Sequence, residues 1–275
     1  MLELYGQVEE AVAAIKAKWD KTPRAGIILG TGLGGMVDEI REEASLGYEE
    51  IPNFPKSTAV SHRGRLVCGT LNGLPVMAME GRFHMYEGYP LKQITLPVRV
   101  MRAMGAELLL VSNACGGLNP YFRNGDLVVI EDHINLMGDN PLIGINDDRL
   151  GPRFPDMCEP YDRKLIDKAL EIARKEDIVA HQGVFVAVAG PNLETRAEYR
   201  FLRTIGADMV GMSTVPEVIV AVHCGMRVVG FSIVTDMCLP DALEPADVSK
   251  IIATANAAEP KLRTLVRGVL AAENV

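Results

Sequence analysis

Short apolar runs that end in small or polar residues recur along the chain, and this pattern limits the folds that it can adopt. Each run has about the length of a buried β-strand, and segments with helical periodicity lie between several of them. The strand-like runs are AGIILG (25–30), LPVMAME (74–80), ELLLVSNA (107–114), DLVVIED (126–132), GVFVAVAG (183–190), ADMVGMS (207–213) and RVVGFSIVTD (227–236). Their alternation with helices predicts an α/β fold with a central β-sheet flanked by helices.

Amphipathic periodicity predicts helices at both ends of the chain and between strands. The first twenty residues mix apolar residues with alternating charges and lack the basic region of a signal peptide, so we expect a helix there. Further helices are expected in residues 91–106, 161–177, 194–207 and 245–273. No Gly/Ser linker or low-complexity tract divides the chain, which favours a single domain over residues 1–275.

The composition argues against several classes of protein. The net charge is −8 and no basic cluster occurs, so we expect no nucleic-acid partner. No stretch approaches about 18 uninterrupted apolar residues, the length that predicts a membrane span. The five cysteines are scattered without CxxC spacing, which favours reduced thiols in a cytoplasmic protein and no structural zinc or other metal site.

The polar ends of the strand-like runs predict one shared site, because ligands of α/β sheets bind where strands end. One of these ends needs a particular explanation. Asp236 directly follows the apolar run FSIVT, and an acid at the end of a buried strand requires either solvent or a partner.

The motif GTGLGG follows a strand-like run and matches the G-x-G-x-x-G pattern of dinucleotide-binding proteins, with Glu49 or Glu50 about 20 residues further on. However, the stretch EEASLGYEEIP before these acids makes a poor second strand. We therefore favour a different use of the motif. Backbone amides at a helix start, together with the Thr31 hydroxyl, would cradle a single phosphate.

The segment GRFHMYEGY carries Arg82, His84 and Tyr86 at alternate positions, which lie on one face if the segment is extended. An arginine fork with a ring nitrogen and a phenol suits a phosphate or a sugar hydroxyl. The alternative is a solvated strand edge. His62, in SHRGRL, stands beside two arginines, a setting that equally fits an ordinary surface residue.

Three other motifs each allow a functional and a purely structural interpretation. In SNACGGLNP the small Ala114 lets the backbone approach a ligand, although the glycine pair could serve only a tight turn. Ser213 precedes a helix expected near Val215, where it could act only as an N-cap. Glu194, in GPNLETRAEY, lies near a helix start, where the helix dipole alone favours an acid.

Together these motifs resemble the trimeric purine nucleoside phosphorylases, from about residue 20 to residue 270. The family's order and spacing are matched by GTGLGG, SHRGR, GRFHMYEGYPL, SNACGGLN, GPNLET, GADMVGMSTVPEV and the strand that ends in TD. The resemblance implies the nucleoside phosphorylase fold with its mixed sheet. It also implies reversible phosphorolysis of purine (2′-deoxy)ribonucleosides to free base and (deoxy)ribose 1-phosphate, with phosphate as co-substrate and without a metal or organic cofactor.

The resemblance assigns roles to individual residues. Those expected to bind phosphate are Thr31, His62, Arg82, His84, Ser213 and the backbone amide of Ala114. Those expected at the ribose are Tyr86, Met212 and Phe154, the last supplied by the neighbouring subunit of a homotrimer. Those expected at the base are Ala114, Leu193, Glu194 and Asp236. His84, Glu194 and Asp236 are the expected catalytic residues.

Three base-site residues give a mixed indication of substrate. Glu194 matches the family glutamate that accepts the N1–H of a 6-oxopurine, whereas Leu193 replaces a more usual aromatic residue. Asp236 stands where the 6-oxopurine enzymes usually have Asn and adenosine-type relatives have Asp. An ionised Asp236 would repel O6 but accept from a 6-amino group, and a protonated one would donate to N7 as the base leaves.

The position facing the ribose 5′ group is open between two residues. Many purine nucleoside phosphorylases have a histidine there, and the hydrophobic pattern best aligns it with Val248, as in methylthioadenosine phosphorylases. Asp247 is the competing match.

The sequence predicts an enzyme that uses inosine and guanosine and has gained activity on adenosine through Asp236. A methylthioadenosine phosphorylase is the main alternative. A nicotinamide-dependent dehydrogenase, based on GTGLGG, and a nucleoside-binding protein without activity are the others. The last is disfavoured because the chain retains the polar residues that the reaction needs.

Overall fold

A mixed β-sheet forms the centre of the molecule, and helices flank it. The computed structural model describes residues 2–31, 33–58 and 63–273. In this part of the chain nine strands follow the order β2-β3-β4-β1-β5-β8-β7-β6-β9. They are β1 (Ala25–Leu29), β2 (Arg41–Gly47), β3 (Arg65–Leu71), β4 (Leu74–Glu80), β5 (Leu108–Gly117), β6 (Leu127–Leu136), β7 (Ala180–Val188), β8 (Met209–Gly211) and β9 (Arg227–Met237).

One half of the sheet closes on itself. Besides its place beside β6, β9 pairs in parallel with β5, so β5, β8, β7, β6 and β9 form a ring of strands. The ring contains both parallel and antiparallel pairs, since β8 is antiparallel to β5 and parallel to β7. Closure places the ends of β5, β8 and β9 close together, although they are far apart in the sequence.

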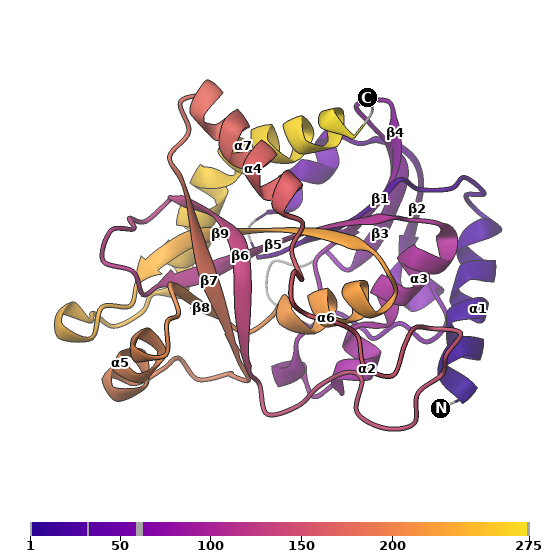
Figure 1. Ribbon diagram of the computed structural model, residues 1–275. Helices are drawn as coiled ribbons and strands as arrows, with labels where there is room; N and C mark the ends of the chain where they lie inside the picture. The colour runs from indigo at the N-terminus through magenta and orange to yellow at the C-terminus, as the bar shows by residue number, and fades with distance from the viewer. Residues whose placement is uncertain (1, 32, 59–62, 274–275) are drawn as a thin grey trace.

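The helices cover the sheet in separate groups (Figure 1). Their bounds are α1 (Leu2–Lys16), α2 (Leu91–Ile94), α3 (Leu96–Met104), α4 (Arg163–Lys175), α5 (Arg196–Thr204), α6 (Val215–His223) and α7 (Val248–Ala272). Four short 3₁₀ helices are η1 (Gly34–Glu39), η2 (Tyr48–Glu50), η3 (Met85–Glu87) and η4 (Pro240–Ala242). Helices α4 and α7 pack together, as do α1 and α3, and α3 also contacts α6. None of the described helices is both long and apolar enough to cross a membrane.

Local sequence signals explain where these helices begin and which face they bury. The Asp162 carboxylate accepts hydrogen bonds from the amides of Lys164 and Leu165, and so caps the start of α4. Apolar residues of α4 at helical spacing, among them Ala169 and Ala173, are buried. Helix α3 ends at Gly105, whose φ of 114° suits a glycine.

The seven predicted strands and the predicted helices are all present, but two strands were missed. Strands β2 and β3 pair antiparallel at the edge of the sheet, and β2 is largely exposed, so its polar sequence EEASLG lacks the apolar signal of a buried strand. The judgement that this stretch makes a poor strand was therefore wrong. The fold still does not fit a dinucleotide-binding domain, in which the first two strands are neighbours in the sheet. Here β1 lies between β4 and β5 and not beside β2.

Gly30 lies where the end of β1 approaches β5. A Cβ atom there would lie 2.7 Å from the Ser112 carbonyl oxygen and 2.9 Å from Asn113 Cα. Both are backbone atoms of β5, so neither can yield without moving the strand. We expect Gly30→Ala to lower the free energy of unfolding by about 1–3 kcal/mol, measured by urea denaturation.

Gly6→Ala is the matched control, because Gly6 lies in α1 and a Cβ atom there would have no neighbour within 4 Å. It should be neutral or stabilising. Equal unfolding midpoints for Gly30→Ala and the wild type would contradict the proposed clash.

Candidate active site

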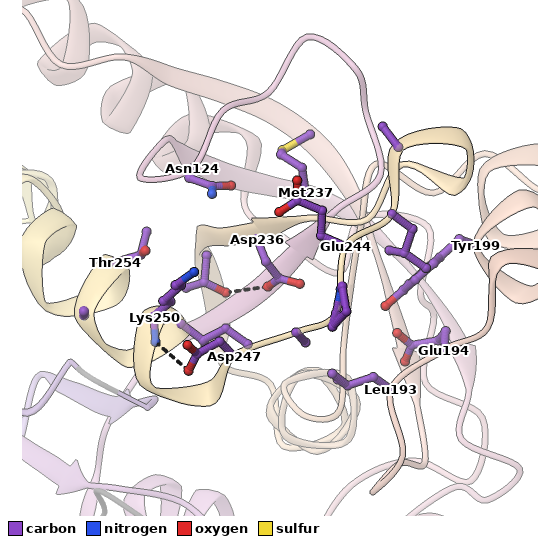
Figure 2. Close-up of a pocket in the computed structure, with 17 residues that line it drawn as sticks. Asn124, Leu193, Glu194, Tyr199, Asp236, Met237, Glu244, Asp247, Lys250 and Thr254 are labelled. Carbon is purple, nitrogen blue, oxygen red and sulfur yellow. Dashed lines mark hydrogen bonds between the residues drawn. The ribbon is translucent and has the colours of Figure 1, made fainter.

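Two adjoining cavities lie where β5, β8 and β9 end. The larger has a volume of about 730 Å³ and the smaller about 180 Å³. Leu193, Thr235, Asp236 and Ile251 line both, so the two cavities meet at the end of β9. Figure 2 shows the larger cavity, with Asp236 near its centre and Glu194 and Asp247 on either side.

Most of the residues singled out in the sequence meet at these cavities. Those that line the smaller cavity are Thr31, Arg82, His84, Tyr86, Ala114, Leu193, Met212, Ser213 and Asp236. Glu194 lines the larger one. The expectation that separate strand ends converge on one polar site is thus confirmed, while the ligand roles of the individual residues stay predictions. His62 lies outside the described residues.

Two predicted ribose residues lie elsewhere. Phe154 is 86% exposed and lines a different cavity, beside His133 and Ile219. Val248 is 62% exposed and is not among the residues lining either of the two cavities. Its neighbour Asp247, the N-cap of α7, does line the larger cavity.

A β-bulge at the end of β9 explains how Asp236 reaches both cavities. In the β5–β9 pairing Cys115 lies opposite Val234 and Gly116 lies opposite Asp236, so Thr235 is an extra residue. Successive side chains of a regular strand point to opposite faces, but a bulge breaks this alternation. Thr235 and Asp236 can therefore both line the cavities.

Arg82 is a buried cation whose nitrogens contact protein groups. Its Nη1 donates to Ser213 Oγ and Thr214 Oγ1, each at 2.8 Å, and its Nη2 donates to the Ser112 carbonyl at 2.6 Å. Burial lowers the pKa of Arg82, and buried Glu217, 3.7 Å from its Nε, opposes that shift. The guanidinium is thus fixed beside the smaller cavity with a compensating carboxylate behind it.

The hydrogen bonds around Thr214 determine which way the Ser213 hydroxyl donates. Thr214 Oγ1 accepts from Arg82 and, at 2.9 Å, from Asn113 Nδ2, so both of its lone pairs are used. Its own proton then goes to Ser213 Oγ, 3.2 Å away. Ser213 Oγ accepts from Arg82 and Thr214, which leaves its proton for a group in the cavity. The Ser213 hydroxyl can therefore donate a hydrogen bond into the cavity, as the binding of an anion requires.

Thr214 holds this network from a strained backbone. Its φ of 74° and ψ of −53°, with the Val215 amide 2.8 Å from the Ser213 carbonyl, form a γ-turn that is rare for a β-branched residue. Neither Thr214 nor Asn113 was predicted from the sequence as a site residue. Their positions next to Ser213 and Ala114 were the available signal, because a buried polar side chain beside a site needs a hydrogen-bond partner.

His84 and Tyr86 reach the smaller cavity by a different route from the one predicted. The chain is extended at His84 but turns into η3 at Met85, so simple alternation does not continue to Tyr86. Instead the two rings stack, with centroids 4.7 Å apart.

The stacked His84 ring is oriented by Glu87. Although burial acts against it, hydrogen bonds from His84 and Thr58 lower the pKa of Glu87 to about 2. The Glu87 carboxylate is thus an acceptor for His84 Nδ1, 3.1 Å away.

Four acidic residues line the larger cavity, and two of them, Glu194 and Asp236, have polar side chains bonded to them (Figure 2). Burial raises the pKa of Glu194, and a hydrogen bond with Tyr199 opposes that shift. The Asp236 carboxyl is held on both oxygens, by the Thr235 hydroxyl at 2.9 Å and the Cys238 thiol at 3.3 Å. Within the described residues no group of three or more His, Cys, Asp or Glu could hold a metal ion.

Comparisons with known proteins agree with this site. A sequence model described as the phosphorylase superfamily matches residues 24–271. Purine nucleoside phosphorylase 1 of Bacillus subtilis is 49% identical, covering 96% of this chain and 98% of the relative. The Bos taurus purine nucleoside phosphorylase is 52% identical, covering 82% and 81%. A solved Schistosoma purine nucleoside phosphorylase in complex with hypoxanthine is 40% identical, with a TM-score of 0.91 over 96% of both chains.

The chain therefore belongs to the phosphorylase superfamily. Within that superfamily it is one of the purine nucleoside phosphorylases, and it is an enzyme of that class.

Replacing the Thr214 hydroxyl tests the network at Arg82. Thr214→Val keeps the shape of the side chain but leaves buried Asn113 Nδ2 without its acceptor. We expect the free energy of unfolding to fall by about 1–3 kcal/mol, as measured by chemical denaturation. Thr214→Ser, which keeps the hydroxyl, should retain most of the stability. If Thr214→Val were as stable as the wild type, the hydrogen bonds at Thr214 would not support the site.

Proposed function

We propose that this enzyme catalyses the reversible phosphorolysis of inosine, guanosine and their 2′-deoxy forms, and that Asp236 adds adenosine to its substrates. The observation that carries the proposal is the pairing of two carboxyl groups, Glu194 and Asp236, in one cavity that adjoins a cationic, hydroxyl-lined one. Solved Schistosoma relatives hold hypoxanthine in one case and adenosine in another, which supports a purine range of this breadth.

The smaller cavity is the proposed phosphate site. Ser213 offers a hydroxyl proton, Arg82 supplies a positive charge behind it, and Thr31 and His84 line the same space. The Ala114 backbone amide completes the set, with His62 a prediction from the sequence. A phosphate dianion is favoured in such a site because fixed donors and a buried cation replace its water shell.

Catalysis would depend on placing this phosphate against C1′ of the ribose. A phosphate oxygen forms a bond to C1′ as the bond from C1′ to the purine N9 breaks, and the electron pair of that bond leaves with the base. The sugar gains oxocarbenium character on the way, which an adjacent anion stabilises. Positioning alone can supply about 7–11 kcal/mol in favourable cases, so no metal or organic cofactor is needed for this step.

The larger cavity is the proposed base site. Glu194, when ionised, accepts the N1–H of a 6-oxopurine, and Tyr199 orients the carboxylate. Asp236 faces the edge of the base that carries N7 and the 6-substituent. It accepts from a 6-amino group when ionised, and when protonated it gives N7 the proton that neutralises the leaving purine.

The 5′ side of the larger cavity favours a nucleoside with a free hydroxyl. Glu244, Asp247 and Lys250 line this cavity, so a methylthio group would meet charged side chains. This lining argues against the methylthioadenosine alternative. It also supports Asp247, which lines this cavity, over Val248, which does not, as the partner of the 5′-hydroxyl.

A homotrimer completes the proposal. Phe154 is exposed on its own chain, as expected for an aromatic residue that covers the ribose of a neighbouring subunit. The assembly follows from the family resemblance.

Removing the Ser213 hydroxyl tests the phosphate site. Ser213→Ala should lower kcat/KM for phosphate by about tenfold to a hundredfold, because one charge-assisted hydrogen bond is lost. The KM for inosine should change little. The measurement is initial rates of hypoxanthine release at varied phosphate. Cleavage of inosine by the wild type without any phosphate would contradict phosphorolysis.

The residue at position 236 tests the substrate range. Asp236→Asn should lower kcat/KM for adenosine by about tenfold to a hundredfold, since an amide has no acidic proton to give N7 and its neutral oxygen is a weaker acceptor than a carboxylate. Activity on inosine should be retained, because an amide donates to O6. Wild-type rates on inosine, adenosine and methylthioadenosine at equal concentrations provide the reference. No detectable adenosine turnover by the wild type would remove the broader range, and a strong preference for methylthioadenosine would establish the alternative.

A further inference from the structure

Glu259 is a buried acid in the middle of α7, only 7% exposed, and it reaches the segment that follows β1. Its Oε1 accepts a hydrogen bond from the Met36 amide at 2.9 Å, and the carboxylate also accepts from the Gly35 amide. These amides belong to the first turn of η1. A carboxylate on one element thus binds the start of another that is more than two hundred residues away in sequence.

This contact corrects one expectation from the motif GTGLGG. The backbone amides at the helix start were expected to cradle phosphate, but two of them are occupied by Glu259. Leu33, the N-cap of η1, provides no side-chain cap of its own. The carboxylate from α7 therefore satisfies donors that the local sequence leaves without a cap.

Described residues on both sides of Thr31 are held in place. On one side, Gly30 packs against the backbone of β5 and its carbonyl accepts from the Leu33 amide at 3.1 Å. On the other side η1 begins at Gly34. Only two positions of the sequence separate Thr31 from Gly34, so we expect a displacement of the η1 start to displace Thr31.

Helix α7 also contacts η1 at its far end and the cavities at its own start. Glu39 lies 3.6 Å from Arg263 and 3.4 Å from Arg267, both on α7. Ile251, about 12 Å along the helix from Glu259 at 1.5 Å per residue, lines both cavities. One rigid helix therefore contributes to the nucleoside side and holds the loop on the phosphate side.

We propose that Glu259 is a positioning residue for phosphate binding: its carboxylate fixes the start of η1 and thereby holds the Thr31 hydroxyl in the smaller cavity. The inference rests on the proposed function, since it assigns that cavity to phosphate. Gly35 supports the arrangement, because a Cβ atom there would lie 2.7 Å from Glu259 Oε2 and press on the carboxylate.

The test compares phosphate and nucleoside kinetics in Glu259→Ala. We expect the KM for phosphate to rise by about tenfold, as befits the loss of hydrogen bonds to a charged group, while kcat and the KM for inosine change by less than about threefold. Glu259→Gln keeps one acceptor for the Met36 amide but turns a donor toward Gly35, so it should give an intermediate KM for phosphate. Thermal unfolding of each variant identifies those that are folded.

Arg267→Gln is the matched control. It weakens the ion pair between α7 and Glu39 at the end of η1 but leaves Arg263, which pairs with both Glu39 and Glu259, in place. It does not touch the amides near Thr31, so the KM for phosphate should stay at the wild-type value. Gly35→Ala gives a second route if Glu259→Ala does not fold. Gly35→Ala alone should raise the KM for phosphate above the wild-type value. The double variant Gly35→Ala/Glu259→Gln should have nearly the same KM for phosphate as Glu259→Gln, since the two substitutions act on the same contact.

The possible outcomes separate the two proposals. A wild-type enzyme that needs no phosphate would end the proposed function and this inference together. A phosphate-dependent wild type whose folded Glu259→Ala and Gly35→Ala variants keep the wild-type KM for phosphate would overturn this inference alone. An equal rise in both KM values, or a fall in kcat alone, would also overturn it, because Glu259 would then stabilise the fold generally.

Discussion

The pairing of β5 with β9 is the constraint on which the rest of the active site depends. It closes the ring of strands and brings Ala114, near the end of one strand, beside the end of the other. The bulge at Thr235 then lets consecutive side chains face the cavities, so Asp236 borders both of them. A regular strand would bury one of these polar residues in the sheet, where it would need a separate partner.

A second requirement is that buried charge be compensated on the side away from the ligand. Arg82 has Glu217 behind it and hydroxyls in front, and the strained backbone at Thr214 is held because its side chain joins three other groups. The carboxylate of Glu259 likewise satisfies amides at the start of η1 that have no cap from their own segment. The polar groups around the smaller cavity are thus oriented before any ligand arrives, which is what catalysis by positioning requires.

Much of the fold and part of the site were predictable from the sequence. Buried strands such as β5 and β9 have long apolar runs, and their polar ends correctly indicated one site. The edge strand β2 was missed because an exposed strand carries no such signal. Tyr86 was correctly grouped with Arg82 and His84, and all three line the smaller cavity. The predicted reason, alternation along an extended segment, fails because the chain turns into η3 before Tyr86. Val248 and Asp247 are adjacent in sequence, and only the start of α7 determines which of them lines the cavity.

The sequence by itself determined the class of fold and the kinds of polar group available, because buried strands, helices and motif residues are encoded locally. The tertiary structure alone decided which groups meet and which are already engaged. The sequence predicted that the amides near the end of GTGLGG bind phosphate, but in the fold Glu259 of α7 accepts hydrogen bonds from two of them. The direction in which the Ser213 hydroxyl donates likewise depends on Asn113 and Thr214, which come from two different segments. Such contacts join residues far apart in the chain, so no local pattern records them. They depend on the closed ring of strands and on the helix packed beside it.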